Sequence, residues 1–273
     1  AVVGVALHHL LALDWRVAFL WGAVLSSTDA AAVFSVLRGV GVSPRLSGAL
    51  EMESGCNDAP VVLAVILLAS DDPITWLTPL IVVYELAAGA VVGGLFGLGG
   101  GWALRRAALP SVGLYPLAAI AVAVLAYSTG QLLHASGLLA TYVCALVLGN
   151  ARLPHRGGVL SFAEGMGWLA QIGLFVLLGL YAAPQRVPAA LWPALVAGLV
   201  LVLAARPLSV IAAALPFRVP WREQLFLSWS GLRGAVPIVL ALLALTEGAP
   251  GAAMLVDVVF VLVVVTVGYL AAD

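Results

Sequence analysis

The sequence predicts an all-α protein that crosses a membrane many times. Hydrophobic residues make up 63% of its 273 positions and charged residues only 9%, with a mean hydropathy of +1.14. No soluble core needs so much apolar sequence, so a polytopic membrane protein fits best. Apolar runs of about 20 residues, each able to span roughly 30 Å as a helix, recur along the chain. The net charge of -1 leaves no basic surplus for binding nucleic acid, so we expect no such partner.

We expect about nine full transmembrane helices after the end of a cut helix in residues 1–13. Their ranges are 17–37, 48–69, 76–104, 112–133, 136–150, 161–183, 188–214, 224–246 and 251–271. Short turns containing Pro, Gly or Asp separate them. The chain starts without Met and stops as an apolar run finishes, which predicts an N-terminally truncated fragment with one transmembrane domain over residues 1–273.

Arginines in alternate loops predict the orientation in the membrane. Because positive charge favours the cytoplasmic side, we expect four alternate loops to be cytoplasmic. Those loops contain Arg38, Arg45, Arg105, Arg106, Arg152, Arg156, Arg218 and Arg222. The opposite loops contain Arg16 and Arg186. Arg206 and Arg233 lie within apolar spans and therefore need another explanation.

Polar and charged residues interrupt the apolar span at 48–69. A charge near the bilayer centre costs on the order of 2.5 to 3.5 kcal/mol, so such groups usually face a partner, a cavity or an ion. Ser54 and Asp58 are four residues apart and share one helix face, while Glu53 and Asn57 form a neighbouring stripe. One stripe could coordinate an ion and the other could hold a buried arginine.

Two spans have the composition of broken helices. In span 17–37, the hydroxyl-rich segment 26–29 can compete with the helix for backbone hydrogen bonds. In span 224–246, glycines and a proline within 231–237 weaken the helix around Arg233. A pair of broken helices is typical of transporters, because the half-helix ends face a cavity near the middle of the membrane.

Four segments, in this order along the chain, resemble monovalent cation/proton antiporters of the NhaP type, especially the potassium/proton branch. They are SSTDAAAVF at 26–34, EMESGCND at 51–58, ARP at 205–207 and GLRGAVP at 231–237. The resemblance implies an inverted-repeat antiporter fold with two broken crossing helices. It also implies a homodimer in the full-length protein and a multi-pass location in the inner (plasma) membrane.

The resemblance assigns residues to the site. The cation- and proton-binding residues would be Asp58, Asp29, Ser54, Thr28 and Asn57. Asp58 would bind cation and proton alternately, whereas Asp29 could contact the ion or only support the helix break. Glu53 and Arg206 would form a structural ion pair, and Arg233 would compensate charge where the broken helices cross. Asn57 stands where electrogenic relatives carry a second Asp, so the resemblance implies electroneutral exchange.

The resulting interpretation is a secondary antiporter that exchanges K+ or Na+ for H+ and contributes to pH homeostasis, with Li+ also open. Residues 17–70 and 188–271 would form two parts of the ion-transporting core, and 76–183 the scaffold and dimerisation helices. We expect no enzymatic activity, cofactor or metal centre. Two alternatives are a cation channel and an intramembrane aspartyl protease using Asp29 and Asp58, although the chain lacks the Gly-x-Gly-Asp pattern of such proteases.

Other features predict structural roles. Glycines at four-residue spacing from Gly89 to Gly101 form a smooth strip where another helix can approach closely. Cys56 and Cys144 are expected to be small buried hydrophobic residues. Asp257 is placed near a span end, where its carboxylate is expected to reach water.

Overall fold

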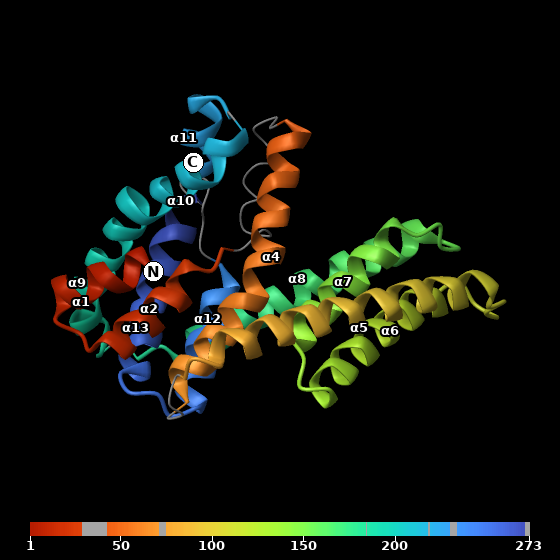
Figure 1. Cartoon of the computed structure of the whole chain (residues 1–273), viewed down its shortest axis with the longest axis horizontal. Coiled ribbons are helices and arrows are strands. Elements are labelled where there is room, and N and C mark those ends of the chain that lie inside the picture. The colour runs from red at the N-terminus through yellow and green to blue at the C-terminus, as the bar shows by residue number, and fades with distance from the viewer. Residues whose placement is uncertain (29–42, 71–74, 184, 218, 230–233, 271–273) are drawn as a thin grey trace. The chain divides into compact units, whose positions relative to one another are not determined.

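Helices joined by short turns make up the described parts of the chain (Figure 1). The computed structural model describes residues 1–28, 43–70, 75–183, 185–217, 219–229 and 234–270. The chain divides into two compact units, one made of Ala1–Pro73 with Leu174–Asp273 and the other of Ile74–Gly173. The division falls within α8 (Arg156–Tyr181).

The first unit contains the segments with the unusual polar residues. Its other helices are α1 (Val2–Leu11), α2 (Trp15–Ser26), α4 (Pro44–Ala69), α9 (Val187–Val200), the π-helix η1 (Leu201–Ala205), α10 (Arg206–Ala214), the 3-10 helix η2 (Leu215–Phe217), α11 (Trp221–Trp229), α12 (Ala235–Thr246) and α13 (Ala252–Leu270). Helices α2, α4 and α12 contact one another, while α9 packs against α1 and α13. The buried side chains of Trp21, Ile238 and Leu255 lie in the shared core.

Capping side chains determine where the two helices of interest begin. The Asp14 carboxylate accepts a hydrogen bond from the Arg16 backbone N–H at 3.1 Å and caps α2. The Ser43 hydroxyl accepts one from the Leu46 N–H at 3.4 Å, and Pro44 occupies the first turn of α4, where its missing N–H costs little. These caps set the residue at which each helix starts.

Arg16 joins the start of α2 to the end of α4. Its Nε donates to the carbonyl oxygen of Leu68 at 3.0 Å, and a terminal nitrogen donates to that of Leu67 at 3.5 Å. A cation at a helix C-terminus satisfies carbonyl groups that have no partner within the helix. The residue that the sequence placed in a loop therefore also fixes α2 beside α4.

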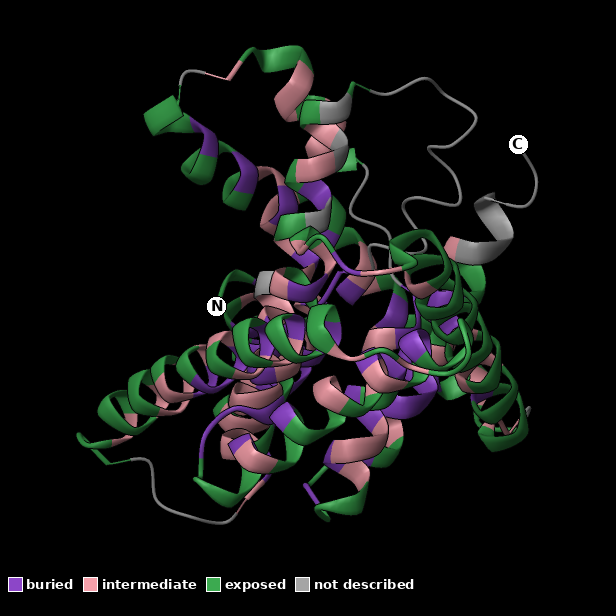
Figure 2. Cartoon of the chain, turned by 90° about the vertical axis from the view of Figure 1, so that its right-hand side faces the viewer, coloured by how far each residue is buried: buried purple, intermediate pink, exposed green. Residues whose placement is uncertain are grey.

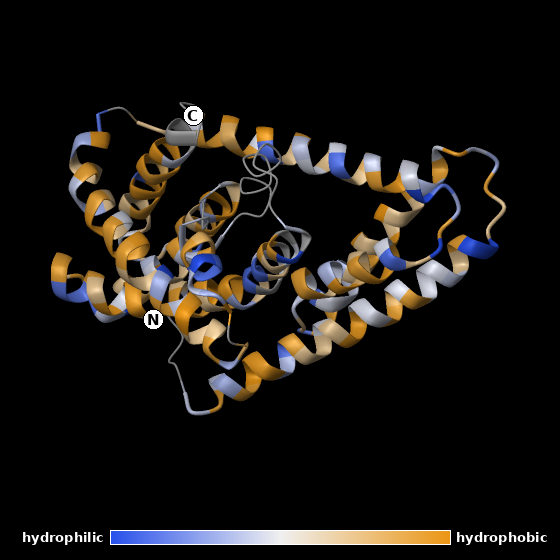
Figure 3. Cartoon of the chain, turned by 90° about the horizontal axis from the view of Figure 1, so that it is seen from above, coloured by the Kyte–Doolittle hydropathy of each residue, from blue (hydrophilic) through white to orange (hydrophobic). Residues whose placement is uncertain are grey.

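Large apolar side chains are exposed along the helices, as expected of a surface that faces lipid. Leu98, Leu132 and Leu180 are examples, and Figure 2 shows exposed residues in green along the helices. Figure 3 shows that apolar residues, in orange, dominate the same helices. Five helices in the described part are long and apolar enough to span a bilayer, and several shorter helices are also apolar. The predicted all-α membrane architecture is confirmed.

The predicted spans correspond to the observed helices, with breaks in two of them. Helix α2 ends at Ser26, and Ser27 is extended with φ -61° and ψ 137°. Helix α12 starts after Gly234, whose φ is -125° and ψ is -133°, and residues 230–233 lie outside the described part of the chain. The remainder of the predicted span 17–37 lies outside the described residues.

The second unit contains a close three-helix arrangement of α5 (Thr78–Arg106), α6 (Leu114–Leu132) and α7 (Gly137–Asn150). The predicted glycine strip on α5 is confirmed. A Cβ at Gly93 would lie 2.3 Å from the carbonyl oxygen of Ala140, and a Cβ at Gly89 would lie 2.6 Å from that of Ser136. Only glycine lets α7 come so near, and Cys144 is buried in this packing as expected.

Gly93→Ala is expected to destabilise the protein by about 1 to 3 kcal/mol, because the added methyl group forces two backbones apart. The matched control is Gly94→Ala, at whose Cβ position nothing lies within 4 Å. That change should be neutral or slightly stabilising, since alanine favours a helix over glycine by about 1 kcal/mol. Melting temperatures of the two variants in detergent check the prediction, and equal melting would contradict it.

The expectation that Asp257 reaches water is wrong. Asp257 is buried on α13, and the Nε of Arg186 lies 3.3 Å from its Oδ2. Arg186 precedes α9, which packs against α13, so the arginine brings a countercharge to the buried carboxylate. A paired charge of this kind tolerates burial that an isolated carboxylate would not.

Candidate functional site

The polar face of α4 holds the unwound end of α2. The Ser54 hydroxyl is buried and donates to the carbonyl oxygen of Thr28 at 2.8 Å. The Asn57 side-chain amide donates to the carbonyl oxygen of Ser26 at 3.4 Å. Carbonyls at the end of a helix have no partner within it, so these donors compensate for the break.

Asp58 lies one residue further along α4 and contacts the same unwound segment. The Ser27 hydroxyl donates to its Oδ1 at 3.3 Å, and Ser27 itself is fully buried. The carboxylate is half-buried. The hydroxyl oxygen of Thr28 is buried and has no hydrogen-bond partner among the described residues. Buried hydroxyls are nearly always satisfied, so Thr28 is suited to an additional ligand such as a cation.

Local sequence explains why both helices are irregular here. Ser26 donates its hydroxyl to the carbonyl oxygen of Ala23 at 2.8 Å, a local bond of the kind that competes with helix continuation. Pro60 lies inside α4 and cannot donate to the carbonyl oxygen of Cys56. The two helices therefore meet where the backbone of each departs from regular hydrogen bonding.

The electrostatics of this position favour a bound positive charge. The C-terminal end of a helix carries a partial negative charge from its carbonyl groups, and Asp58 lies at such an end, that of α2. An ionised carboxylate is therefore placed beside further negative potential. A cation or a proton at Asp58 relieves that repulsion, and one carboxylate can hold only one of them at a time.

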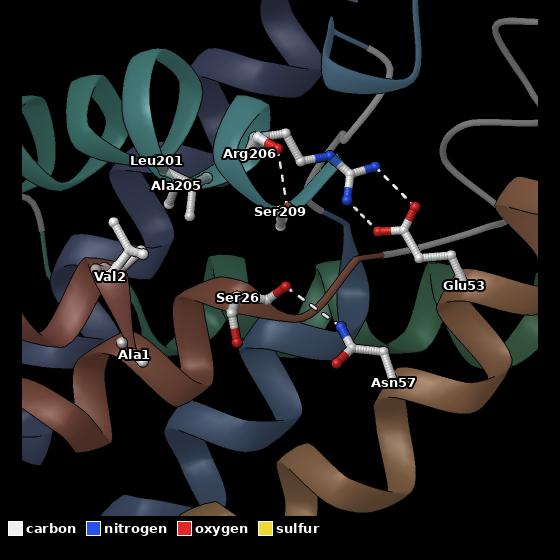
Figure 4. A pocket seen from close by; sticks show the side chains of 11 residues that line it. Ala1, Val2, Ser26, Glu53, Asn57, Leu201, Ala205, Arg206 and Ser209 are labelled. Atoms are coloured by element: carbon white, nitrogen blue, oxygen red, sulfur yellow. Dashed lines mark hydrogen bonds and ion pairs between the residues drawn. The ribbon is translucent and has the colours of Figure 1, made fainter. Parts of the chain in front are cut away.

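Glu53 and Arg206 form a two-point ion pair that joins α4 to α10 (Figure 4). One guanidinium nitrogen of Arg206 bonds Glu53 Oε1 and the other bonds Oε2, the latter at 3.0 Å. The Arg206 side chain is 8% exposed and the Glu53 side chain 35% exposed. This contact is the one that the resemblance to antiporters implied for these two residues.

A π-helical turn precedes Arg206, where the sequence suggested a uniform helix over 188–214. The backbone N–H of Arg206 donates to the carbonyl oxygen of Leu201, five residues earlier. Pro207 explains the widened turn, because proline lacks an N–H and its ring clashes with the carbonyl four residues before it. The Arg206-Pro207 pair is the sequence feature from which this turn could have been predicted.

The structure brings together most of the predicted site, but Asp29 and Arg233 lie outside the described residues. Ser27 is the contact that the sequence reasoning missed. Ser27 belongs to the hydroxyl-rich segment from which the helix break was predicted. Nothing in the sequence indicated that its hydroxyl bonds Asp58. Asn57 contacts backbone of the unwound segment.

Broken apolar helices surrounding a half-buried carboxylate are features of a membrane transport protein. The chain belongs to the transmembrane sodium/hydrogen exchanger family, which matches residues 1–270. The fold of this region is therefore that of a cation/proton exchanger, as the sequence predicted.

Comparison with individual proteins agrees with this assignment. The chain is 39% identical over 275 residues to the K(+)/H(+) antiporter NhaP of Alkalimonas amylolytica and 38% identical over 272 residues to the K(+)/H(+) antiporter NhaP2 of Shewanella oneidensis. Each match covers 97% of this chain and 47% of the relative, so the chain spans about half the length of these curated relatives.

A solved structure has the same fold. The sodium proton antiporter MjNhaP1 from Methanocaldococcus jannaschii matches with a TM-score of 0.85 and 22% sequence identity, over 100% of this chain and 75% of the other. The antiporter fold predicted from the sequence is confirmed by this likeness.

Proposed function

We propose that the protein exchanges a monovalent cation for protons across the inner (plasma) membrane. The observation that carries the proposal is the position of Asp58, half-buried at the unwound end of α2 in a chain of the exchanger family. Asp58 binds the cation or a proton, and Ser54 and Thr28 complete the oxygen-rich surroundings. Potassium is the first cation to test, because the relatives that share 38 to 39% identity are named as potassium/proton antiporters.

Competition for Asp58 supplies the coupling between the two fluxes. The carboxylate must lose its proton before it binds the cation, so the site crosses the membrane carrying one or the other. The empty ionised form crosses poorly, because an uncompensated charge in a low-dielectric barrier is costly. One proton then exchanges for one monovalent cation, which makes the exchange electroneutral.

The remaining predicted residues support this cycle. Asn57 holds the end of α2 rather than carrying charge, and the Glu53–Arg206 pair fixes α4 against α10. Asp29 joins the ion site and Arg233 offsets charge where the broken helices cross. The core segments 17–70 and 188–271 move against a scaffold formed by 76–183, and the protein works as a homodimer.

The proposal is tested by reconstituting the intact protein in liposomes with a pH-sensitive dye inside. An imposed outward cation gradient should drive proton uptake with K+, and the same assay with Na+ and Li+ establishes selectivity. The signal should be unaffected when the membrane voltage is clamped to zero. A cation current with no coupled proton movement would instead indicate a channel.

A further inference from the structure

Two cavities of the first unit meet at the Glu53–Arg206 ion pair. The first has a volume of about 540 Å³, and its lining includes Ala1 and Val2 at the start of α1, Ser26 at the end of α2, and Asn57, whose amide donates to the Ser26 carbonyl oxygen (Figure 4). Asp58 follows Asn57 on α4, and Ser27, which bonds Asp58, follows Ser26. Glu53 and Arg206 line this cavity and also line the second one.

The second cavity, of about 370 Å³, lies on the other side of the pair. Apart from the pair it is mainly apolar, with Ala49 on α4, Ala213 on α10 and Leu227 on α11 in its wall. Ala49 precedes Asn57 on α4 by about 12 Å along the axis, at roughly 1.5 Å per residue. The two cavities therefore follow one another along α4, with the ion pair between them.

The arginine pattern indicates which of the two cavities lies nearer the cytoplasm. Arg45 lies in the first turn of α4, and Arg222 lies in the first turn of α11, which follows α10; both were predicted from the sequence to be on the cytoplasmic side. The second cavity, near the start of α4 and the end of α10, is then the cytoplasmic one. The first cavity is deeper in the membrane.

The ion pair is built so that one partner stays in place while the other has access to water. Arg206 is buried, and its Nε has no hydrogen-bond partner among the described residues, so the guanidinium is not fully satisfied by the closed pair. Glu53 is 35% exposed and borders both cavities. Rotation of Glu53 alone would open the contact, because its carboxylate can exchange the arginine for water.

We infer that the Glu53–Arg206 pair is a removable barrier between the cytoplasmic cavity and the cavity at Asn57, through which cation and proton reach Asp58. The inference rests on the proposed function and gives the pair a role beyond joining two helices. With the pair closed, the two side chains are in contact across the boundary and their charges cancel, so the barrier is the contact itself. When Glu53 turns toward the ion path, its carboxylate attracts the cation across the same boundary.

Cysteine accessibility tests the barrier in the intact protein, in inside-out vesicles treated with an anionic, membrane-impermeant thiol reagent, which the unpaired Arg206 of the Glu53→Gln variant does not repel. The background replaces Cys56 by Ser and Cys144 by Ala. Ala213→Cys reports the cytoplasmic cavity and should react rapidly. Ala205→Cys reports the deeper cavity and should react slowly while the ion pair is intact.

Adding Glu53→Gln, which removes the charge of the pair, should accelerate reaction of Ala205→Cys by at least about tenfold, with no change at Ala213→Cys. Ala241→Cys is the control for unfolding, because Ala241 is fully buried on α12 and should stay unreactive. Unchanged reaction of Ala205→Cys while Ala241→Cys stays protected would overturn the inference.

If Glu53→Gln makes Ala241→Cys reactive, that variant is partly unfolded, and Arg206→Lys is used in its place. Lysine keeps the charge but loses the two-point contact, so reaction of Ala205→Cys should rise to an intermediate rate. A rate equal to that with Arg206 would overturn the inference. Labelling needs no transport, so a failed exchange assay with the expected labelling would reject the proposed function and leave the barrier supported.

Discussion

Asp58→Asn is expected to reduce cation/proton exchange to the level of protein-free liposomes. Asparagine has nearly the same shape as aspartate, and its side-chain oxygen can still accept the hydrogen bond from Ser27. It cannot take up and release a proton, nor can it offer a full negative charge to a cation. The fold should therefore persist while the one group shared by both substrates is lost.

The measurement is exchange in proteoliposomes together with the melting temperature of the same preparation. Asp14→Asn is the matched control, since Asp14 caps α2 from a loop and asparagine caps a helix about as well. That variant should transport and melt like the unsubstituted protein. Normal exchange by Asp58→Asn would rule out Asp58 as the carrier of the coupled ions.

Arg206→Ala is expected to have the largest effect on stability, a loss of about 3 to 5 kcal/mol, because it leaves Glu53 without its countercharge in a partly buried position. The partial exposure of Glu53 places the expected value near the lower end of that range. The loss should appear as a lower melting temperature in detergent.

Two further variants separate the charge from the packing at this position. Replacing Glu53 by Leu and Arg206 by Met together should recover most of the stability, since an apolar pair of similar volume often substitutes for a buried ion pair. Arg152→Ala removes an exposed arginine and should change melting little. If Arg206→Ala melts like Arg152→Ala, the pair does not hold α4 against α10.

Much of the fold was predictable because the membrane imposes a simple constraint on sequence. Each span needs a run of apolar residues, and backbone polar groups must be satisfied within helices. The predicted span 76–104 appears as α5, and 136–150 appears as α7 within one residue at its start. The glycine strip was equally predictable from the sequence, because a four-residue spacing places small residues on one helix face.

The details of the site were less predictable, because they depend on contacts between segments distant in sequence. The spacing of Ser54 and Asp58 showed a shared face, but could not show that this face contacts the Ser27 hydroxyl and the Thr28 carbonyl oxygen. The bond from Arg16 to the end of α4 and the pair formed by Arg186 with Asp257 are of the same kind. Each needs a partner about 50 or more residues away, which composition and periodicity do not specify.

The proposed competition of cation and proton for one carboxylate is tested most directly by the pH dependence of the apparent KM for the cation. Proteoliposomes containing the intact protein are assayed for K+-driven exchange over a series of pH values. As pH falls, protons occupy Asp58 more often, so the apparent KM should rise, approaching about tenfold per pH unit once the proton form predominates, with an unchanged maximal rate. An apparent KM that is the same at every pH, with only the maximal rate changing, would contradict the account.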